Sequence, residues 1–178
     1  MKAVVVYESM YGNTHLVADA IASGIRASGN NEAVVVPVGE ATPEVVGSAD
    51  LVVVGGPTHA HGMSHEATRH AAVEAAEKPD SGLEMDPDAE GPGLRDWFGA
   101  LEHVTVAAAA FDTRMDGPGA LTGHASKGIA RRLRHHGCTL VVEPMSFLVT
   151  KDNHLVDEEA EHARDWGAQL VAAFATPG

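Results

Sequence analysis

The stretch that decides the fold is Val5-Val-Tyr-Glu-Ser-Met-Tyr-Gly-Asn-Thr14, continuing as His15-Leu-Val-Ala-Asp-Ala-Ile21. It predicts an apolar strand, a short polar loop and an amphipathic helix. The loop can present backbone N–H groups and the hydroxyls of Ser9 and Thr14 at a helix N-terminus, whose positive partial charge suits a bound phosphate. It contains no lysine, no G-x-x-x-x-G-K pattern of triphosphate sites and no G-x-G-x-x-G pattern of dinucleotide sites. We therefore expect a monophosphate group here.

Length and composition are those of one globular domain. The chain has 178 residues, 44% of them hydrophobic, and we expect a single domain over residues 1–178. A formal net charge of −13 argues against nucleic acid and against an anionic membrane surface as partners. It is compatible with a basic protein partner. The only cysteine, Cys138, is expected to be a buried, inert thiol, and the absence of a signal-peptide pattern predicts a cytoplasmic location.

Apolar segments of strand length alternate with segments of helical period along the chain. Such alternation predicts a parallel sheet covered on both faces, a three-layer α/β/α architecture. We expect a doubly wound five-stranded sheet of order 2-1-3-4-5. The expected strands are 3–7, 33–38, 50–55, 104–111 and 139–149, the last interrupted near Pro144. The expected helices are 14–28, 41–48, 65–78, 94–101, 122–136 and one capped by Asp157 that runs to about residue 174, with an exposed loop over 79–93.

In a doubly wound sheet, ligands bind at the carboxyl ends of the strands, beside the point where the strand order reverses. This rule brings together the loops Ser9–Thr14, Pro57–Met63 and Asp112–Gly119. The phosphate loop, chosen from its own chemistry, therefore falls where the topology places a ligand.

The spacing of the first segment resembles the signature of the flavodoxin family. The matching positions are Tyr7, Ser9, Gly12, Thr14, Ala18 and Ile21, and Gly-x-Pro-Thr at 55–58 is similar to a second family motif. The resemblance implies FMN as cofactor, held by its phosphate at Ser9, Met10, Tyr11, Gly12, Asn13 and Thr14. It implies that one side of the flavin ring lies against Pro57, Thr58, His59, Ala60, His61 and Gly62, and the other against Phe111, Asp112, Thr113 and Arg114. No residue is assigned a catalytic or metal-binding role.

The sequence departs from the family at the ring. The tryptophan and tyrosine that usually stack on the flavin are missing, which leaves His59, His61 or Met63 for one face and Phe111, Arg114 or Met115 for the other. An arginine near the ring would stabilise the anionic reduced flavin and raise its potential, unless Arg114 pairs with Asp112 or Asp116. The pattern His59-x-His61-x-x-x-His65 could supply metal ligands, but the Gly-x-Pro-Thr context favours a flavin loop.

These features favour an electron-transfer protein that works between a flavin reductase, or another redox protein, and an acceptor. One alternative is an FMN-dependent reductase of a quinone or similar molecule that uses NAD(P)H. Another is an interaction module with weak or no flavin affinity. The basic segment Lys127, Arg131, Arg132 and Arg134 is expected to be a solvated helix face or a contact with a second subunit.

Overall fold

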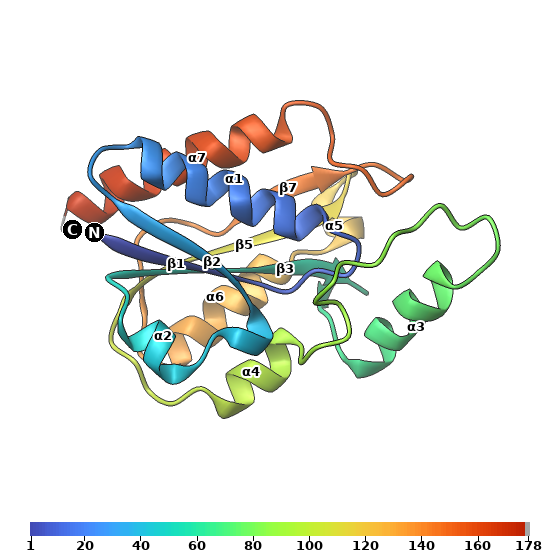
Figure 1. The fold of residues 1–178 in the computed structure, drawn as a ribbon, viewed down its shortest axis with the longest axis horizontal. Coiled ribbons are helices and arrows are strands. Elements are labelled where there is room, and N and C mark those ends of the chain that lie inside the picture. The colour runs from blue at the N-terminus through green and yellow to red at the C-terminus, as the bar shows by residue number, and fades with distance from the viewer. Residues whose placement is uncertain (177–178) are drawn as a thin grey trace.

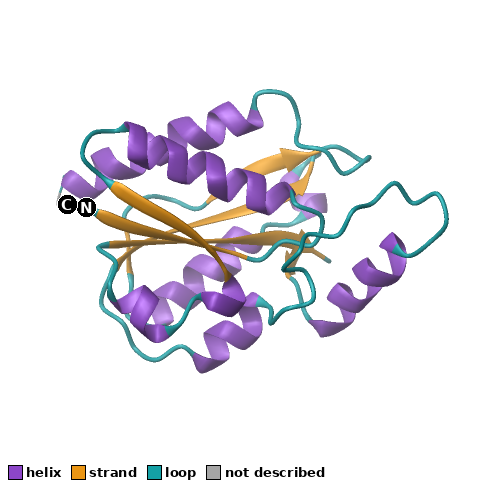
Figure 2. Ribbon diagram, in the orientation of Figure 1, coloured by secondary structure: helices purple, strands orange, loops and turns teal. Residues whose placement is uncertain are grey.

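The sheet lies between two layers of helices in the computed structural model, which describes residues 1–176 (Figures 1 and 2). Strands β1 (Lys2–Tyr7), β2 (Glu32–Pro37), β3 (Leu51–His59) and β5 (Ala107–Met115) are parallel, in the order β2-β1-β3-β5. Beyond β5 lie β6 (Thr139–Leu140) and β7 (Met145–Val149), which form two halves of a fifth strand. The predicted doubly wound 2-1-3-4-5 sheet is therefore confirmed.

Alternating side chains of the strands enter different helical layers. In β1, Val5 and Tyr7 face α1 (Asn13–Ala27) and α7 (Glu159–Ala175), whereas Val4 and Val6 face the opposite layer. That opposite layer contains α2 (Pro43–Gly47), α4 (Leu94–Ala100) and α6 (Ala125–His135). The valine-rich strands are thus buried on both faces.

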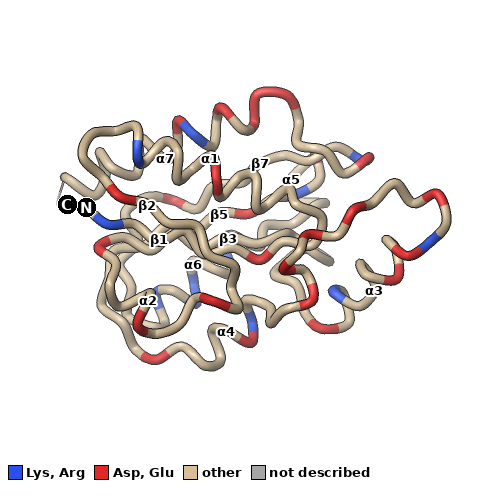
Figure 3. The backbone as a smooth tube through the Cα atoms, in the orientation of Figure 1, with Lys and Arg blue, Asp and Glu red and all other residues tan. Residues whose placement is uncertain are grey.

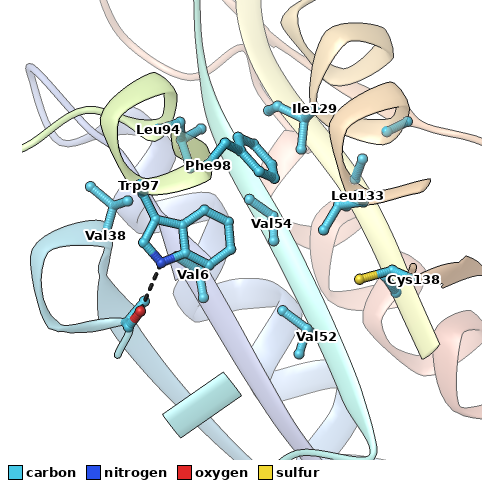
Figure 4. Close-up of a cluster of buried hydrophobic side chains, with 14 of the residues drawn as sticks. Val6, Val38, Val52, Val54, Leu94, Trp97, Phe98, Ile129, Leu133 and Cys138 are labelled. Carbon is cyan, nitrogen blue, oxygen red and sulfur yellow. Dashed lines mark hydrogen bonds between the residues drawn. The ribbon is translucent and has the colours of Figure 1, made fainter. Parts of the chain in front are cut away.

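Aromatic residues fill the layer of α4 and α6 (Figure 4). Trp97 and Phe98 of α4 are buried beside Val6, and their rings meet edge to face at 4.8 Å between centroids. The indole Nε1 of Trp97 donates a hydrogen bond of 2.7 Å to the carbonyl of Ala41, so the only polar atom of this large side chain is paired. Cys138 is buried in the same cluster.

Two further elements lie outside the main layers. Strand β4 (Gly62–Met63) pairs with the end of β3 as an antiparallel hairpin. Helix α3 (Glu66–Ala76) follows this hairpin and projects from the body (Figure 1), and the remaining short elements are η1 (Val38–Glu40) and α5 (Gly119–Thr122). No described helix is long and apolar enough to cross a membrane.

Several boundaries differ from those predicted, and three of the differences change the description of the chain. Strand β5 runs to Met115, so residues 112–115, which were expected to form a loop, lie in the sheet. All four pair with β7, and Asp112 and Thr113 pair with β3 as well. Helix α7 begins at Glu159 after Glu158, which has φ +70° and no side-chain cap, so the expected Asp157 cap was wrong. Segment 56–63, expected to be a loop, is mostly the hairpin of β3 and β4.

The interruption of the fifth strand was predicted correctly. Pro144 lies between β6 and β7, and a proline has no N–H group to donate to a neighbouring strand. β6 and β7 nonetheless both pair in parallel with β5, so the carboxyl end of β7 reaches the same edge of the sheet as those of β1, β3 and β5.

Candidate functional site

A cavity of about 340 Å³ opens at the carboxyl edge of the sheet. That volume lies within the range of small-molecule and cofactor sites. The predicted site residues that line it are Ser9, Met10, Tyr11, Asn13, Thr14, Pro57, Thr58, His59, Thr113 and Arg114. The unpredicted ones are Leu83, Val149, Thr150, Lys151 and Asn153, and Met115 lines it as well. The structure thus brings the three expected segments together and adds a fourth, after β7.

The loop Ser9–Thr14 leads from β1 directly into α1. Gly12 precedes the helix with φ +86°, in the left-handed region that glycine tolerates best. Its N–H donates a 3.0 Å hydrogen bond to Ser9 Oγ, which fixes the turn. No side chain caps this helix end, so within the described chain the first-turn N–H groups of Asn13 and Thr14 remain available to an acceptor.

Hydrogen bonds tie the start of α1 to the other walls of the cavity. The buried hydroxyl of Thr14 lies 2.7 Å from that of Thr113 in β5. The side-chain amide of Asn13 donates to the backbone and side-chain oxygens of Asn153, at 3.0 and 3.1 Å. These contacts hold the donors of the helix end in position before any ligand arrives. A phosphate group is the natural acceptor for such a set.

A tight hairpin turn forms the wall that follows β3. Thr58 pairs with Met63 and His59 with Gly62, which leaves Ala60 and His61 as the two turn residues. Both have positive φ, +46° and +71°, the values that a primed hairpin turn requires and that Asn and Gly usually supply. Ala60 and His61 are exposed and do not line the cavity, and Gly62 lies outside it too. Of the four residues His59 to Gly62, only His59 lines the cavity.

The two residues expected at the start of the third segment lie elsewhere. Phe111 is 0% exposed and packs against Phe147 and Trp166, with ring centroids 6.2 and 6.4 Å away. It therefore belongs to the core rather than to a ligand face. Asp112 is buried as well, and its Oδ2 accepts a 2.7 Å hydrogen bond from the N–H of Ser126 at the start of α6.

Asp112 and Thr58 together cap helix α6. Thr58 Oγ1 accepts a 3.0 Å hydrogen bond from the N–H of Ala125, the residue before Ser126. The negative charge of Asp112 also lies at the positive end of the helix dipole. Asp112 Oδ1 has no partner among the described residues. Both side chains therefore fix the hairpin and α6 relative to the sheet.

The hydrogen bonds of Arg114 go to carbonyl and hydroxyl oxygens rather than to a carboxylate. One terminal nitrogen donates to the carbonyl of Gly117 at 2.8 Å and to Thr122 Oγ1 at 3.1 Å. The alternative that it pairs with Asp112 or Asp116 is wrong, because no described salt bridge joins it to either. Its positive charge lines the cavity together with that of Lys151.

The 79–93 segment is not simply the exposed loop that was expected. The N–H of Asp86 donates to the carbonyl of Met10 at 2.8 Å, and the Asp86 carboxylate lies 3.1 Å from His15 Nδ1. The hydroxyl of Tyr7 donates to Asp88 at 3.0 Å, and burial together with that carboxylate raises the pKa of Tyr7. These contacts bind the segment to the Ser9–Thr14 loop and bring Leu83 to the cavity.

Glu8, directly after β1, connects the walls of the site and was not predicted. Its buried carboxylate accepts a 2.7 Å hydrogen bond from the N–H of Leu94 at the start of α4, and the hydroxyl of Ser64 donates to its other oxygen. A charged residue immediately after an apolar strand was the available signal. The contacts position the hairpin next to β1.

Burial lowers the pKa of His59, because desolvation disfavours the imidazolium form, although the Glu8 carboxylate opposes this shift. An imidazole whose pKa is lower when folded binds fewer protons in the native than in the unfolded state. Stability is therefore lost as the pH falls through the unfolded value of about 6.5. We expect His59→Gln to flatten the decline in the free energy of unfolding below pH 7, measured by urea denaturation of the cofactor-free protein.

The same substitution at the exposed His70 controls for removal of an imidazole in general. If the free energy of unfolding had the same pH dependence in His59→Gln as in the His70→Gln control, the pKa of His59 would be the same in the folded and unfolded states.

The histidines do not form a metal site with their neighbours. Across residues 1–176, no group of three or more His, Cys, Asp or Glu side chains is arranged to hold a metal ion. His59 and His61 lie on different sides of the hairpin, since one lines the cavity and the other does not. The structure therefore gives no support for the metal alternative.

Several solved structures share this fold. A flavodoxin from the domain Archaea is 20% identical, with a TM-score of 0.66 over 99% of this chain and 100% of that one. Flavodoxin 1 from Bacillus cereus is 22% identical, with a TM-score of 0.66 over 97% and 98% of the two chains. A flavodoxin, WrbA-like protein from Agrobacterium tumefaciens is 21% identical, with a TM-score of 0.56 over 98% and 97%. At these identities the similarity shows the fold alone.

Sequence comparison identifies the family. A search of curated proteins found no match. The family model described as Flavodoxin, however, matches residues 5–166, a range that starts within β1 and includes the Ser9–Thr14 loop and all the later strands. The chain therefore belongs to the flavodoxin family.

Proposed function

We propose that the cavity holds FMN and that the protein transfers electrons between a reductase and an acceptor. Members of the flavodoxin family bind FMN, and the family implies an electron-transfer role. The observation that carries the proposal is the uncapped start of α1, whose free N–H groups and buried Thr14 hydroxyl face a cofactor-sized cavity. When bound, FMN supplies the redox chemistry, because it can accept and release electrons one or two at a time.

The residues of the Ser9–Thr14 loop fit the phosphate of that cofactor. Ser9 and Thr14 would donate hydroxyls and the first turn of α1 would donate N–H groups, while the helix dipole favours the negative charge. Arg114 and Lys151 add positive charge to the same cavity. Of the predicted residues, Phe111 and Asp112 have no place in this proposal, since both are buried away from the cavity. Ala60, His61 and Gly62 have none either, because they lie outside it.

The walls available to the flavin ring are weakly aromatic. His59 lies on the hairpin side and Met115 on the β5 side, and Tyr11 is the only tyrosine among the residues that line the described cavity. Its hydroxyl is engaged with the carbonyl of Ala72 at 2.8 Å. An imidazole and a thioether stack less strongly than tryptophan and tyrosine. We therefore expect FMN affinity to depend heavily on the phosphate contacts. The expected influence of Arg114 on the flavin potential stays a prediction.

A second candidate is an FMN-dependent reductase that takes electrons directly from NAD(P)H and passes them to a quinone. The observation in its favour is Leu83, which the long 79–93 segment brings to the wall of the cavity, where it could contact an apolar acceptor. An interaction module without flavin remains the third possibility, and a cytoplasmic location remains a prediction.

The experiment that separates these functions uses FMN-loaded protein under anaerobic conditions. For an electron carrier, we expect little reaction with NADPH alone and rapid reduction when a catalytic amount of a flavin-containing NADPH reductase is added. Cytochrome c then serves as the artificial acceptor and should reoxidise the protein. Sustained turnover of menadione with NADPH and no added reductase would contradict the carrier and support the second candidate. A protein that never takes up FMN would contradict both.

A further inference from the structure

A second concave surface, the basic groove, lies beside helix α6 and has a volume of about 580 Å³. Its charged lining residues are Arg95, Lys127, Arg131 and Arg132, and His61, His124 and His135 line it as well. Across the described chain, no Asp or Glu contributes to this lining. The groove therefore concentrates positive charge in a protein whose formal net charge is −13.

The spacing along α6 explains how one helix serves both core and groove. Lys127, Arg131 and His135 are four residues apart, so they form one stripe on the helix surface. Ile129 and Leu133 lie on another face and are fully buried. Figure 3 shows that Lys and Arg are sparse elsewhere along the backbone, where Asp and Glu predominate. The basic stripe is thus a local feature and not a reflection of overall composition.

Two of the arginines are held in place by the protein. Arg95 donates from Nε to the carbonyl of Ser64 at 2.8 Å and from a terminal nitrogen to that of Met63 at 3.1 Å. The guanidinium of Arg132 lies over the ring of Phe98, 5.9 Å from its centroid. Because these contacts restrict the side chains, less conformational entropy is lost when an anion binds.

The four cations are not neutralised within the protein. Among the described residues, no carboxylate lies within 4.0 Å of the charged nitrogens of Arg95, Lys127, Arg131 or Arg132. The chain has 25 acidic residues, so carboxylates are not scarce. Like charges held together repel one another, and a bound anion would relieve that repulsion.

We infer that the basic groove binds a small anion that carries two or more phosphate groups. A concave site suits a compact ligand, and arginine forks match phosphate oxygens in geometry and charge. Groove and cavity lie on either side of the hairpin, since His59 lines the cavity while His61 and Gly62 line the groove. A ligand in the groove would therefore be next to the cofactor site. The inference concerns binding alone and does not depend on FMN.

Inorganic pyrophosphate is the probe, and isothermal titration calorimetry at low ionic strength is the measurement. The titration uses Thr14→Val protein, so that the Ser9–Thr14 loop contributes less to phosphate binding, and is repeated with FMN-loaded wild-type protein. We expect one groove site in both, weakened about tenfold or more by Arg131→Glu. The matched control is Arg134→Glu, which makes the same charge change on α6 outside the groove and should cost less than about threefold. Arg131→Gln repeats the test with a smaller charge change.

Three outcomes would overturn the inference. Pyrophosphate could fail to bind, or Arg131→Glu and Arg134→Glu could weaken it equally, which would indicate only the general field of the helix. Alternatively, poly-L-glutamate could bind through Arg131 while pyrophosphate does not, which would assign the groove to an acidic protein partner. Failure of FMN to bind would leave the Thr14→Val titration intact, so the two proposals fail independently.

Discussion

Replacing Thr14 with valine is expected to weaken FMN binding by roughly 10- to 100-fold. Valine keeps the shape of threonine but removes the hydroxyl that lies at the uncapped start of α1, inside the cavity. A hydrogen bond to a charged acceptor contributes roughly 1.5–3 kcal/mol, which corresponds to that change in dissociation constant. Quenching of FMN fluorescence on titration with wild-type and variant protein provides the measurement.

The contact between Thr14 and Thr113 requires a control. Their hydroxyls are 2.7 Å apart, so Thr14→Val also breaks this bond. Thr113→Val breaks the same bond from the β5 side and leaves the start of α1 unchanged. If the two variants weakened FMN equally, the effect would come from the lost threonine pair. Unchanged affinity in Thr14→Val would remove the Ser9–Thr14 loop from the phosphate site.

Replacing Gly55 with alanine is expected to destabilise the protein by roughly 3 kcal/mol or more. Gly55 pairs with Phe111 across β3 and β5, and a β-carbon at this position would overlap the Phe111 ring. That ring cannot move aside easily, because it is fully buried against Phe147 and Trp166. Overpacking of a filled core typically costs about 1–3 kcal/mol, and here the core offers no free space. Urea denaturation of the cofactor-free protein measures the change.

A matched control and a rescue variant make this prediction specific. Gly99→Ala, in α4, adds the same methyl group where nothing lies within 4 Å, and should leave stability unchanged or slightly raised. Phe111→Leu shortens the opposing side chain. The Gly55→Ala/Phe111→Leu double variant should therefore be at least about 1 kcal/mol more stable than the sum of the two single destabilisations predicts. Strict additivity would show that the two residues do not compete for space. A stable Gly55→Ala protein would contradict the packing described for β3 and β5.

The strand–loop–helix at the N-terminus could be predicted because its determinants are local. The apolar run that begins at Val5, the glycine at position 12 and the helical period after Thr14 all lie within 17 residues. The order of the sheet followed from the alternation of strands and helices, and the interruption at Pro144 followed from the missing N–H. The strand–loop–helix and the interruption at Pro144 thus depend on local sequence, whereas the strand order follows from a general rule for alternating strands and helices.

The errors arose where distant segments decide the structure. Residues 112–115 look like a polar loop, but they extend β5 and pair with β7, and the first two of them also pair with β3. Phe111 was expected to face the flavin, yet the space left by Gly55 draws it into the core. Asp157 resembled a helix cap, but the chain turns at Glu158, which has a positive φ, before α7 begins.

Part of the site could have been found by stricter use of topology. β7 ends at the same edge as the other strands, so the rule that located three loops also indicates residues 150–153 as a fourth. Leu83 had no such signal. Leu83 reaches the cavity because Asp88 and Asp86 contact Tyr7 and His15, on either side of the Ser9–Thr14 loop. The two residues of each pair are more than 70 positions apart in sequence.

The most direct measurement is the visible absorption spectrum of the purified protein after incubation with excess FMN and removal of unbound ligand. We expect flavin bands that correspond to one FMN per chain in the wild-type protein and to a clearly smaller fraction in Thr14→Val. A colourless wild-type protein that folds normally but retains no FMN would contradict the assignment of the cavity as the cofactor site.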